Sequence, residues 1–152
     1  MYQTLVQLHS VGRWIVLVLL VVAIFRSATA GSRPYTKGDN TTGLLLTIFS
    51  DLMLLIGIYL WFAGGVGYQA IKESGMGSVM QNAVLRFFNT QHMVGMLIAI
   101  ALIHIGKAQG KKSLPDRTKH RRMFLFYLLA LLLILACIPW PFMQAGAGRG
   151  WV

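Results

Sequence analysis

WIVLVLLVVAIF, the stretch from Trp14 to Phe25, contains no charged side chain. It is the centre of an apolar run from about Thr4 to Phe25, which is long enough as an α-helix to cross a hydrocarbon core about 30 Å thick. Three more runs of similar length follow at residues 44–62, about 85–105 and 123–140. The pattern predicts an all-α integral membrane protein, with residues 1–152 forming a single four-transmembrane-helix bundle.

The composition is typical of a chain surrounded largely by lipid. Hydrophobic residues make up 56% of the 152 residues, charged residues make up 12%, and the mean hydropathy is +0.63. A soluble domain has about 25% charged residues, so this chain has too few to cover a surface in water. The net charge of +10 would suggest nucleic-acid binding in a soluble protein. Here the basic residues lie between apolar runs, which favours the lipid bilayer as partner and argues against nucleic acid.

The distribution of basic residues predicts the orientation of the helices. Most of them lie in the loops after the first and third runs. These residues are Arg26, Arg33, Lys37, Lys107, Lys111, Lys112, Arg117, Lys119, Arg121 and Arg122. The positive-inside rule places both loops in the cytoplasm and both termini outside. The external segment at 64–84 is long enough for a short interfacial helix, although its own pattern does not require one.

A short motif recurs in the first and third runs. His9-Ser10-Val11-Gly12 is echoed by His92-Met93-Val94-Gly95, about 80 residues later. Helices that share a direction would make this a 2+2 parallel internal repeat, related by an axis along the membrane normal. Chance similarity within apolar sequence is the alternative, and the sequence leaves both open. In either case the two histidines would face each other across the bundle.

The paired histidines are the main candidate site. His9 and His92 lie at similar depths, roughly 7–11 Å below the external surface. An ionisable group within a span is costly and marks a functional site by default. Ligation of a haem by two histidines requires such matched depths, because the iron takes one nitrogen from each side. Gly12 and Gly95 follow their histidines by three residues, on the same helix face, and would leave room for a flat porphyrin. Close helix packing is the alternative role for the glycines, and a hydrogen bond to a neighbouring helix is the alternative for each histidine.

Two arginines lie close to this site in the sequence. Arg13 could bind a haem propionate or pair with Asp51 in the second span, and we prefer the pair because each buried charge needs a partner. Arg86, at the external mouth of the third span, is then the better propionate ligand.

His104 and His120 form a weaker second pair. His104 follows His92 by twelve residues, which turns it about 120° around the helix and away from the haem-facing stripe. His120 lies in the basic sequence Lys119-His120-Arg121-Arg122. One haem b is therefore favoured over two.

Four motifs carry a resemblance to a known family. They are LHSVGRW at 8–14, RFF at 86–88, QHMVG at 91–95 and IPWPF at 138–142. On these motifs the chain resembles small bacterial four-helix membrane proteins labelled cytochrome b-like, over nearly its whole length. The resemblance implies a haem-binding bundle in the bacterial cytoplasmic (inner) membrane, with His9 and His92 at the ligand positions. More distantly, the chain is similar in architecture to the cytochrome b561 class and to four-helix haem proteins that oxidise protoporphyrinogen, whose further motifs it lacks.

These observations favour a b-type haem protein in electron transfer. It would be a small subunit or partner of a membrane redox complex, or exchange electrons with a quinone. A non-redox membrane scaffold or assembly subunit is the first alternative. A haem-dependent membrane oxidoreductase that acts on a quinol or a porphyrin is the second.

Overall fold

The structure, a computed structural model, describes residues 1–151. All regular elements in this part of the chain are helical: α1 (Tyr2–Ala28), α2 (Lys37–Ala63), α3 (Tyr68–Gln81), α4 (Ala83–Arg86), the π-helix η1 (Phe87–His92), α5 (Met93–Ala108), the 3-10 turn η2 (Gln109–Lys111), α6 (Asp116–Cys137) and the 3-10 turn η3 (Gln144–Gly146). Four helical stretches are long and apolar enough to cross a membrane: α1, α2, the continuous stretch Ala83–Lys111, and α6. This confirms the predicted all-α fold with four transmembrane helices.

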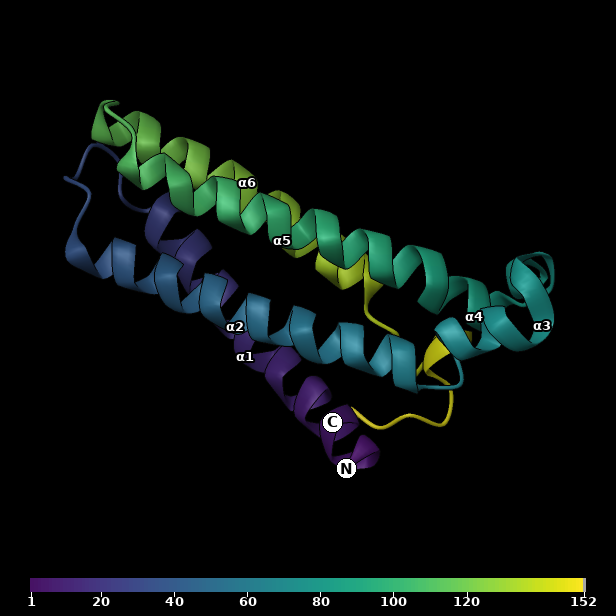
Figure 1. The fold of residues 1–152 in the computed structure, drawn as a ribbon. Helices are drawn as coiled ribbons and strands as arrows, with labels where there is room; N and C mark the ends of the chain where they lie inside the picture. The colour runs from purple at the N-terminus through teal and green to yellow at the C-terminus, as the bar shows by residue number, and fades with distance from the viewer. Residues whose placement is uncertain (152) are drawn as a thin grey trace.

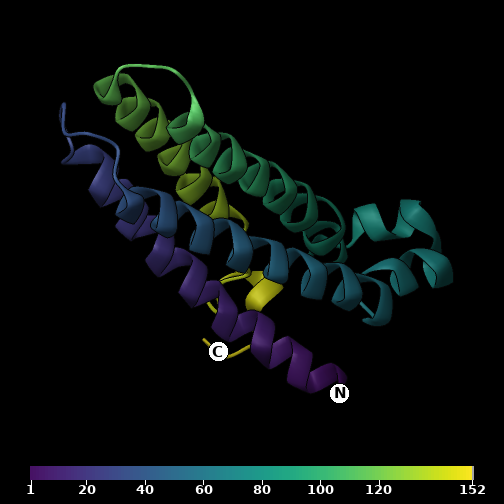
Figure 2. The same ribbon diagram turned by 60° about the vertical axis from the view of Figure 1, so that its left-hand side comes forward.

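The four long helices form a bundle in which α1 and α5 lie on one diagonal. Helix α1 packs against α2 and α6, and α5 packs against the same two helices. Figures 1 and 2 show α1 moving away from α5 toward the end of the bundle that carries the N-terminus. A parallel two-helix repeat would place its equivalent helices on a diagonal in this way. Both the repeat and the orientation stay predictions.

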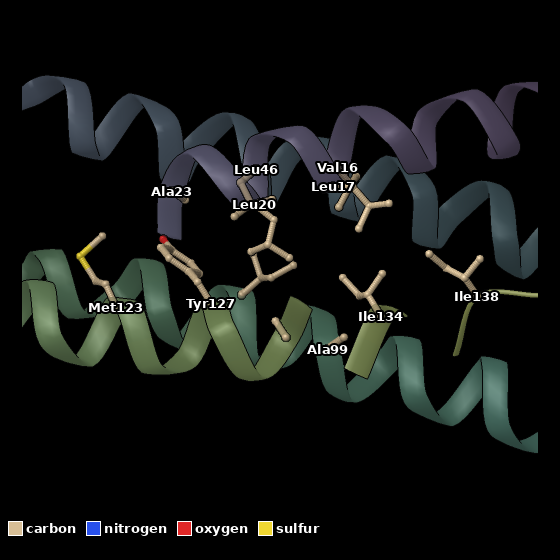
Figure 3. Packing of buried hydrophobic residues seen from close by; sticks show 12 residues of the cluster. Val16, Leu17, Leu20, Ala23, Leu46, Ala99, Met123, Tyr127, Ile134 and Ile138 are labelled. Carbon is tan, nitrogen blue, oxygen red and sulfur yellow. The ribbon is translucent and has the colours of Figure 1, made fainter. Parts of the chain in front are cut away.

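The core fills the middle of the bundle with side chains from all four helices. Leu20 of α1, Leu46 of α2, Ala99 of α5 and Tyr127 of α6 are each fully buried (Figure 3). The outer faces carry exposed aliphatic residues such as Leu55, as expected for helices in lipid. Because lipid tails are as apolar as these side chains, the helices are held together by close packing, to which small residues contribute.

The helices extend beyond the apolar runs at the basic end of the bundle. Helix α2 begins at Lys37, where Thr36 and Asp39 form a capping box. The Asp39 carboxylate also accepts hydrogen bonds from Arg26 and Arg33, at 2.9 Å and 2.8 Å for the closest pairs. Hydropathy detects only the part of a helix that lies in hydrocarbon. The polar first turn of α2 was therefore not expected.

The connection between α2 and α5 contains a helix, which the sequence allowed but did not require. Helix α3 spans Tyr68–Gln81 and is broken at Gly75, whose φ of 79° is readily adopted only by glycine. It runs into α4 and then into η1, the π-helical start of the third span. Figure 1 shows α3 projecting from the end of the bundle, next to α4, which begins the third span.

The C-terminal segment folds back across the same end. After Cys137 the chain returns toward α1, where the backbone carbonyl of Trp151 accepts hydrogen bonds from the Arg13 guanidinium and from Trp14 Nε1, the latter at 2.9 Å. Figure 2 shows this segment crossing beside the N-terminal half of α1. The tail thereby covers the splayed end of the bundle.

Candidate functional site

The structure brings His9 and His92 together across the bundle diagonal. His9 projects from α1, and His92 is the last residue of η1. Their ring centroids lie 6.3 Å apart, with an angle of 70° between the ring planes. Both side chains are partly buried at the splayed end of the bundle. The two rings can meet because they lie at a similar depth and point toward each other from helices on one diagonal of the bundle.

His92 is oriented by the end of α6. Its Nδ1 lies 2.8 Å from the carbonyl oxygen of Cys137 and donates a hydrogen bond to it. In an α-helix that carbonyl would accept from the backbone nitrogen four residues later, but this residue is Pro141, which has no N–H. The motif IPWPF thus leaves a free acceptor for the imidazole. With Nδ1 protonated, Nε2 of His92 carries the lone pair that a metal would bind.

The second proline of this motif frees another carbonyl in the same way. Pro139 cannot donate to Leu135, and the Leu135 carbonyl instead accepts from Trp140 Nε1 at 2.9 Å. In the last turn of α6, side-chain donors therefore bond to the carbonyls that have no backbone N–H partner. The sequence contained this signal, since each proline marks a carbonyl four residues earlier that must find another donor.

His9 lies against a glycine of α2. A Cβ atom placed on Gly57 would be 3.3 Å from His9 Cε1, so the absence of a side chain there lets the ring approach the helix. Its Nδ1 is buried and has no hydrogen-bond partner among residues 1–151. A buried polar atom of this kind is rare in folded proteins and is often explained by a function or a bound group.

The π-helix that precedes α5 was not predicted from the sequence. It covers Phe87–His92, where backbone hydrogen bonds join residues five apart instead of four. Asn89 stabilises it by accepting from Trp61 Nε1 at 2.9 Å and donating to the carbonyls of Val66 and Leu85 at 2.7 and 2.8 Å. Isolated π-helical turns often occur at functional sites. This one ends on the candidate ligand.

The arginines surround the site but do not all behave as expected. The predicted pair of Arg13 with Asp51 is wrong, because Arg13 binds the Trp151 carbonyl and lies over the Trp14 and Trp140 rings, at 5.4 and 5.9 Å. The two residues project from neighbouring helices in different directions, which depth alone does not reveal. Arg86 donates to the Met80 carbonyl at 2.9 Å, at the mouth of the third span.

One basic residue near the histidines had no predicted role. Arg149, in the tail, lies over the Phe88 ring with 4.7 Å between its guanidinium carbon and the centroid. Phe88 in turn contacts His92, with 5.9 Å between the ring centroids. The folded tail thus adds a second arginine, besides Arg13, to the end of the bundle that holds the histidines.

Gly12 and Gly95 face neighbouring helices. A Cβ on Gly12 would meet the thioether end of Met53 in α2, and one on Gly95 would collide with the sulfur of Cys137 in α6. Their observed contacts are those of close helix packing, the alternative role considered for them. Met53 is a flexible side chain that can move, so the space beside Gly12 is adjustable.

His104 and His120 lie outside this site, and the two histidines contact different residues. His104 Nε2 lies 2.9 Å from Asp51 Oδ1, on the surface between α5 and α2. His120 is buried in α6, where its Nε2 lies 3.1 Å from the Arg33 carbonyl and its ring packs beside Tyr35. The structure does not bring these two histidines together.

His9 and His92 could supply two imidazole nitrogens to one metal centre. Their ring centroids lie 6.3 Å apart, and the rings come from helices on one diagonal of the bundle. Within residues 1–151, no three or more His, Cys, Asp or Glu side chains are grouped so that they could hold a metal ion. Two ligands suit a haem iron, because the porphyrin supplies the other four.

Comparison of this chain with protein-family models, with curated proteins and with solved structures found no match.

Proposed function

We propose that this protein binds one haem b between His9 and His92 and takes part in electron transfer within a membrane. The observation that carries the proposal is the 6.3 Å approach of two imidazoles from diagonal helices. The hydrogen bond from His92 to the Cys137 carbonyl supports it, since metal-binding histidines commonly donate their other ring nitrogen to such an acceptor.

The histidines and the nearby arginines would have different parts in haem binding. His92 and His9 would ligate the iron, while Arg13, Arg86 and Arg149 supply positive charge for the propionates. The bound haem would contribute reversible one-electron chemistry. The chain itself would fix the ligand orientation and exclude water, because the tail with Trp140 and Trp151 covers the end of the bundle. Gly12 would make room only after movement of Met53.

The proposed setting is a bacterial cytoplasmic membrane, in which the chain would be a small subunit or partner of a redox complex. Four spans with short connections leave little of the described chain outside the bilayer to bind a soluble substrate. A quinone or a membrane protein is therefore the proposed exchange partner.

A non-redox scaffold or assembly subunit is the second candidate function. It is favoured by the packing of Gly12 and Gly95 against α2 and α6, and by the link from His92 to the end of α6. On this view the histidines fasten helices to each other, and their closeness is a consequence of the packing.

A reduced-minus-oxidised absorption spectrum of the detergent-purified protein separates the two functions. We expect a b-type spectrum from the unmodified protein and its loss in His9→Ala and in His92→Ala. His104→Ala is the matched control, because it removes an imidazole from α5 outside the site, and its spectrum should be retained. A colourless protein after expression with ample haem would overturn the proposal and favour the scaffold.

A further inference from the structure

Asp51 and His104 form a polar pair on the outer surface of the bundle. His104 Nε2 lies 2.9 Å from Asp51 Oδ1 and joins α5 to α2. The side chains are 49% and 48% exposed, although both belong to membrane-spanning helices. Ionisable residues within a membrane normally face the interior of a bundle, because exposing them to lipid is costly. A pair that is half exposed there indicates a surface that receives a polar group from outside the chain.

The position of this pair limits what can reach it. His104 follows His92 by twelve residues, so it lies about 18 Å further along α5, toward the other leaflet. Exposed aliphatic side chains flank the pair on α2, including Ile48 and Leu55. On α5 the residue one turn before His104 is Ala101, which is small and exposed. A molecule dissolved in the bilayer can therefore reach the pair, and the small Ala101 leaves room beside it for a flat polar head.

The chemistry of the pair limits the ligand further. The bond between the two side chains uses one atom from each, Nε2 and Oδ1. The second carboxylate oxygen is an acceptor, and Nδ1 of His104 is an acceptor when the ring is neutral and a donor when it is protonated. The pair can thus accept hydrogen bonds from hydroxyl groups or donate one to a carbonyl oxygen. A phosphate headgroup fits poorly, because Asp51 would repel it.

We propose that Asp51 and His104 bind the headgroup of a lipid-soluble quinone or hydroquinone. This class of molecule dissolves in the bilayer, has a flat ring, and carries oxygen atoms that change from acceptors to donors between its oxidised and reduced forms. Those properties match the lipid-facing position, the small neighbour Ala101 and the two-way hydrogen bonding of the pair. The role of the site in electron exchange rests on the proposed function, but binding at the site does not require a haem.

Calorimetric titration with a decyl-substituted 1,4-benzoquinone tests the site, using the full chain in lipid nanodiscs. We expect saturable binding to the unmodified protein, and at least 10-fold weaker binding to Asp51→Asn and to His104→Gln. Asp116→Asn is the matched control for the lost carboxylate, because Asp116 lies at the start of α6 and contacts Lys119. Binding to this control should be unchanged. Equal affinity in all variants, or no saturable binding to the unmodified protein, would overturn the proposal.

Two further measurements distinguish the quinone site from a contact between copies of the chain and from the haem site. Sedimentation of each variant in detergent reports its mass, and dissociation of an oligomer by Asp51→Asn would overturn the proposal by identifying the surface as a contact between copies. Titration of His9→Ala separates this proposal from the haem proposal. Quinone binding by a colourless His9→Ala protein would support the site independently. If the protein shows the haem spectrum but Asp51→Asn binds the quinone as tightly as the unmodified protein does, the quinone site is refuted and the haem proposal still stands.

Discussion

At the scale of single residues, Asp39 connects α1 and α2 at the basic end of the bundle. It is 4% exposed, caps the first turn of α2 through Thr36, and accepts hydrogen bonds from Arg26 at the end of α1 and from Arg33 in the loop. A buried carboxylate needs such partners, because an uncompensated charge would be strongly destabilising. The same side chain therefore defines where α2 begins and holds the α1–α2 loop in place.

Asp39→Ala should lower the free energy of unfolding by at least about 1 kcal/mol, the usual cost of losing an N-cap interaction. The loss should exceed this value because the two arginines also lose their acceptor. Thr41→Ala is the control, since Thr41 is exposed on the same helix, and its effect should stay within about 0.5 kcal/mol. Unfolding in mixed micelles with increasing SDS measures both. Equal stability of the two variants would show that the Asp39 contacts contribute little.

The sequence predicted the histidine pair from two quantities, the depth of each histidine in the membrane and the direction of its helix. Equal depth and a common helix direction follow from counting residues along two apolar runs, and both are needed to bring His9 and His92 near each other. The partner of Asp51 depends on more. It requires knowledge of which helices are neighbours and which way each face is turned, and depth alone suggested Arg13. Only the packed bundle selects His104.

At the scale of helices, contacts between α5 and α6 depend on two glycines of α5. A Cβ on Gly106 would lie 2.8 Å from Tyr127 Cε1 and 3.0 Å from Cδ1, in a buried contact with a rigid ring. Gly95 makes the equivalent contact with Cys137 nearer the other end of α6. These two positions let the helices approach closely over most of their length, which is how helices associate in lipid.

Gly106→Ala should destabilise the protein by about 1–3 kcal/mol, the range for overpacking a filled core. Tyr127 is fully buried, so a shift of its rigid ring would disturb other side chains of the core. Gly77→Ala provides the contrast, because a Cβ there meets no atom within 4 Å, and alanine favours the helix. That variant should be at least as stable as the unmodified protein. If Gly106→Ala proves equally stable, the close contact between α5 and α6 is not needed for folding.

The sequence predicted which segments are helical better than it predicted their local form. Apolar runs of about 20 residues leave few alternatives in a membrane, because backbone groups in lipid must bond within the same segment. The π-helix at Phe87–His92 contains Asn89, which bonds to Trp61 and to the carbonyl of Val66, both distant in the sequence. Likewise, the return of the tail to α1 becomes visible only in the structure, where Arg13 and Trp14 donate to the carbonyl of Trp151. Such features depend on tertiary contacts that hydropathy does not encode.

At the scale of the whole molecule, the basic residues and the candidate site lie at opposite ends of the bundle. The loop after α1 and the segment from Lys107 to Arg122 carry most of the positive charge. His9, His92 and the folded tail lie at the other end, with α3. The positive-inside rule thus predicts that the histidine pair lies near the external surface, while Asp51 and His104 lie nearer the cytoplasm. The two proposed sites would then serve different leaflets.

Labelling of single cysteines in spheroplasts tests this orientation. The native Cys137 is buried, so a membrane-impermeant maleimide should leave the unmodified protein unlabelled. Glu73→Cys places a thiol on the exposed surface of α3, and Lys112→Cys places one in the exposed loop before α6. We expect the first variant to react in intact spheroplasts and the second only after the membrane is permeabilised, because strongly basic loops are retained in the cytoplasm. The reverse pattern would put His9 and His92 on the cytoplasmic side, and any electron donor or acceptor of the proposed haem would then have to be sought there.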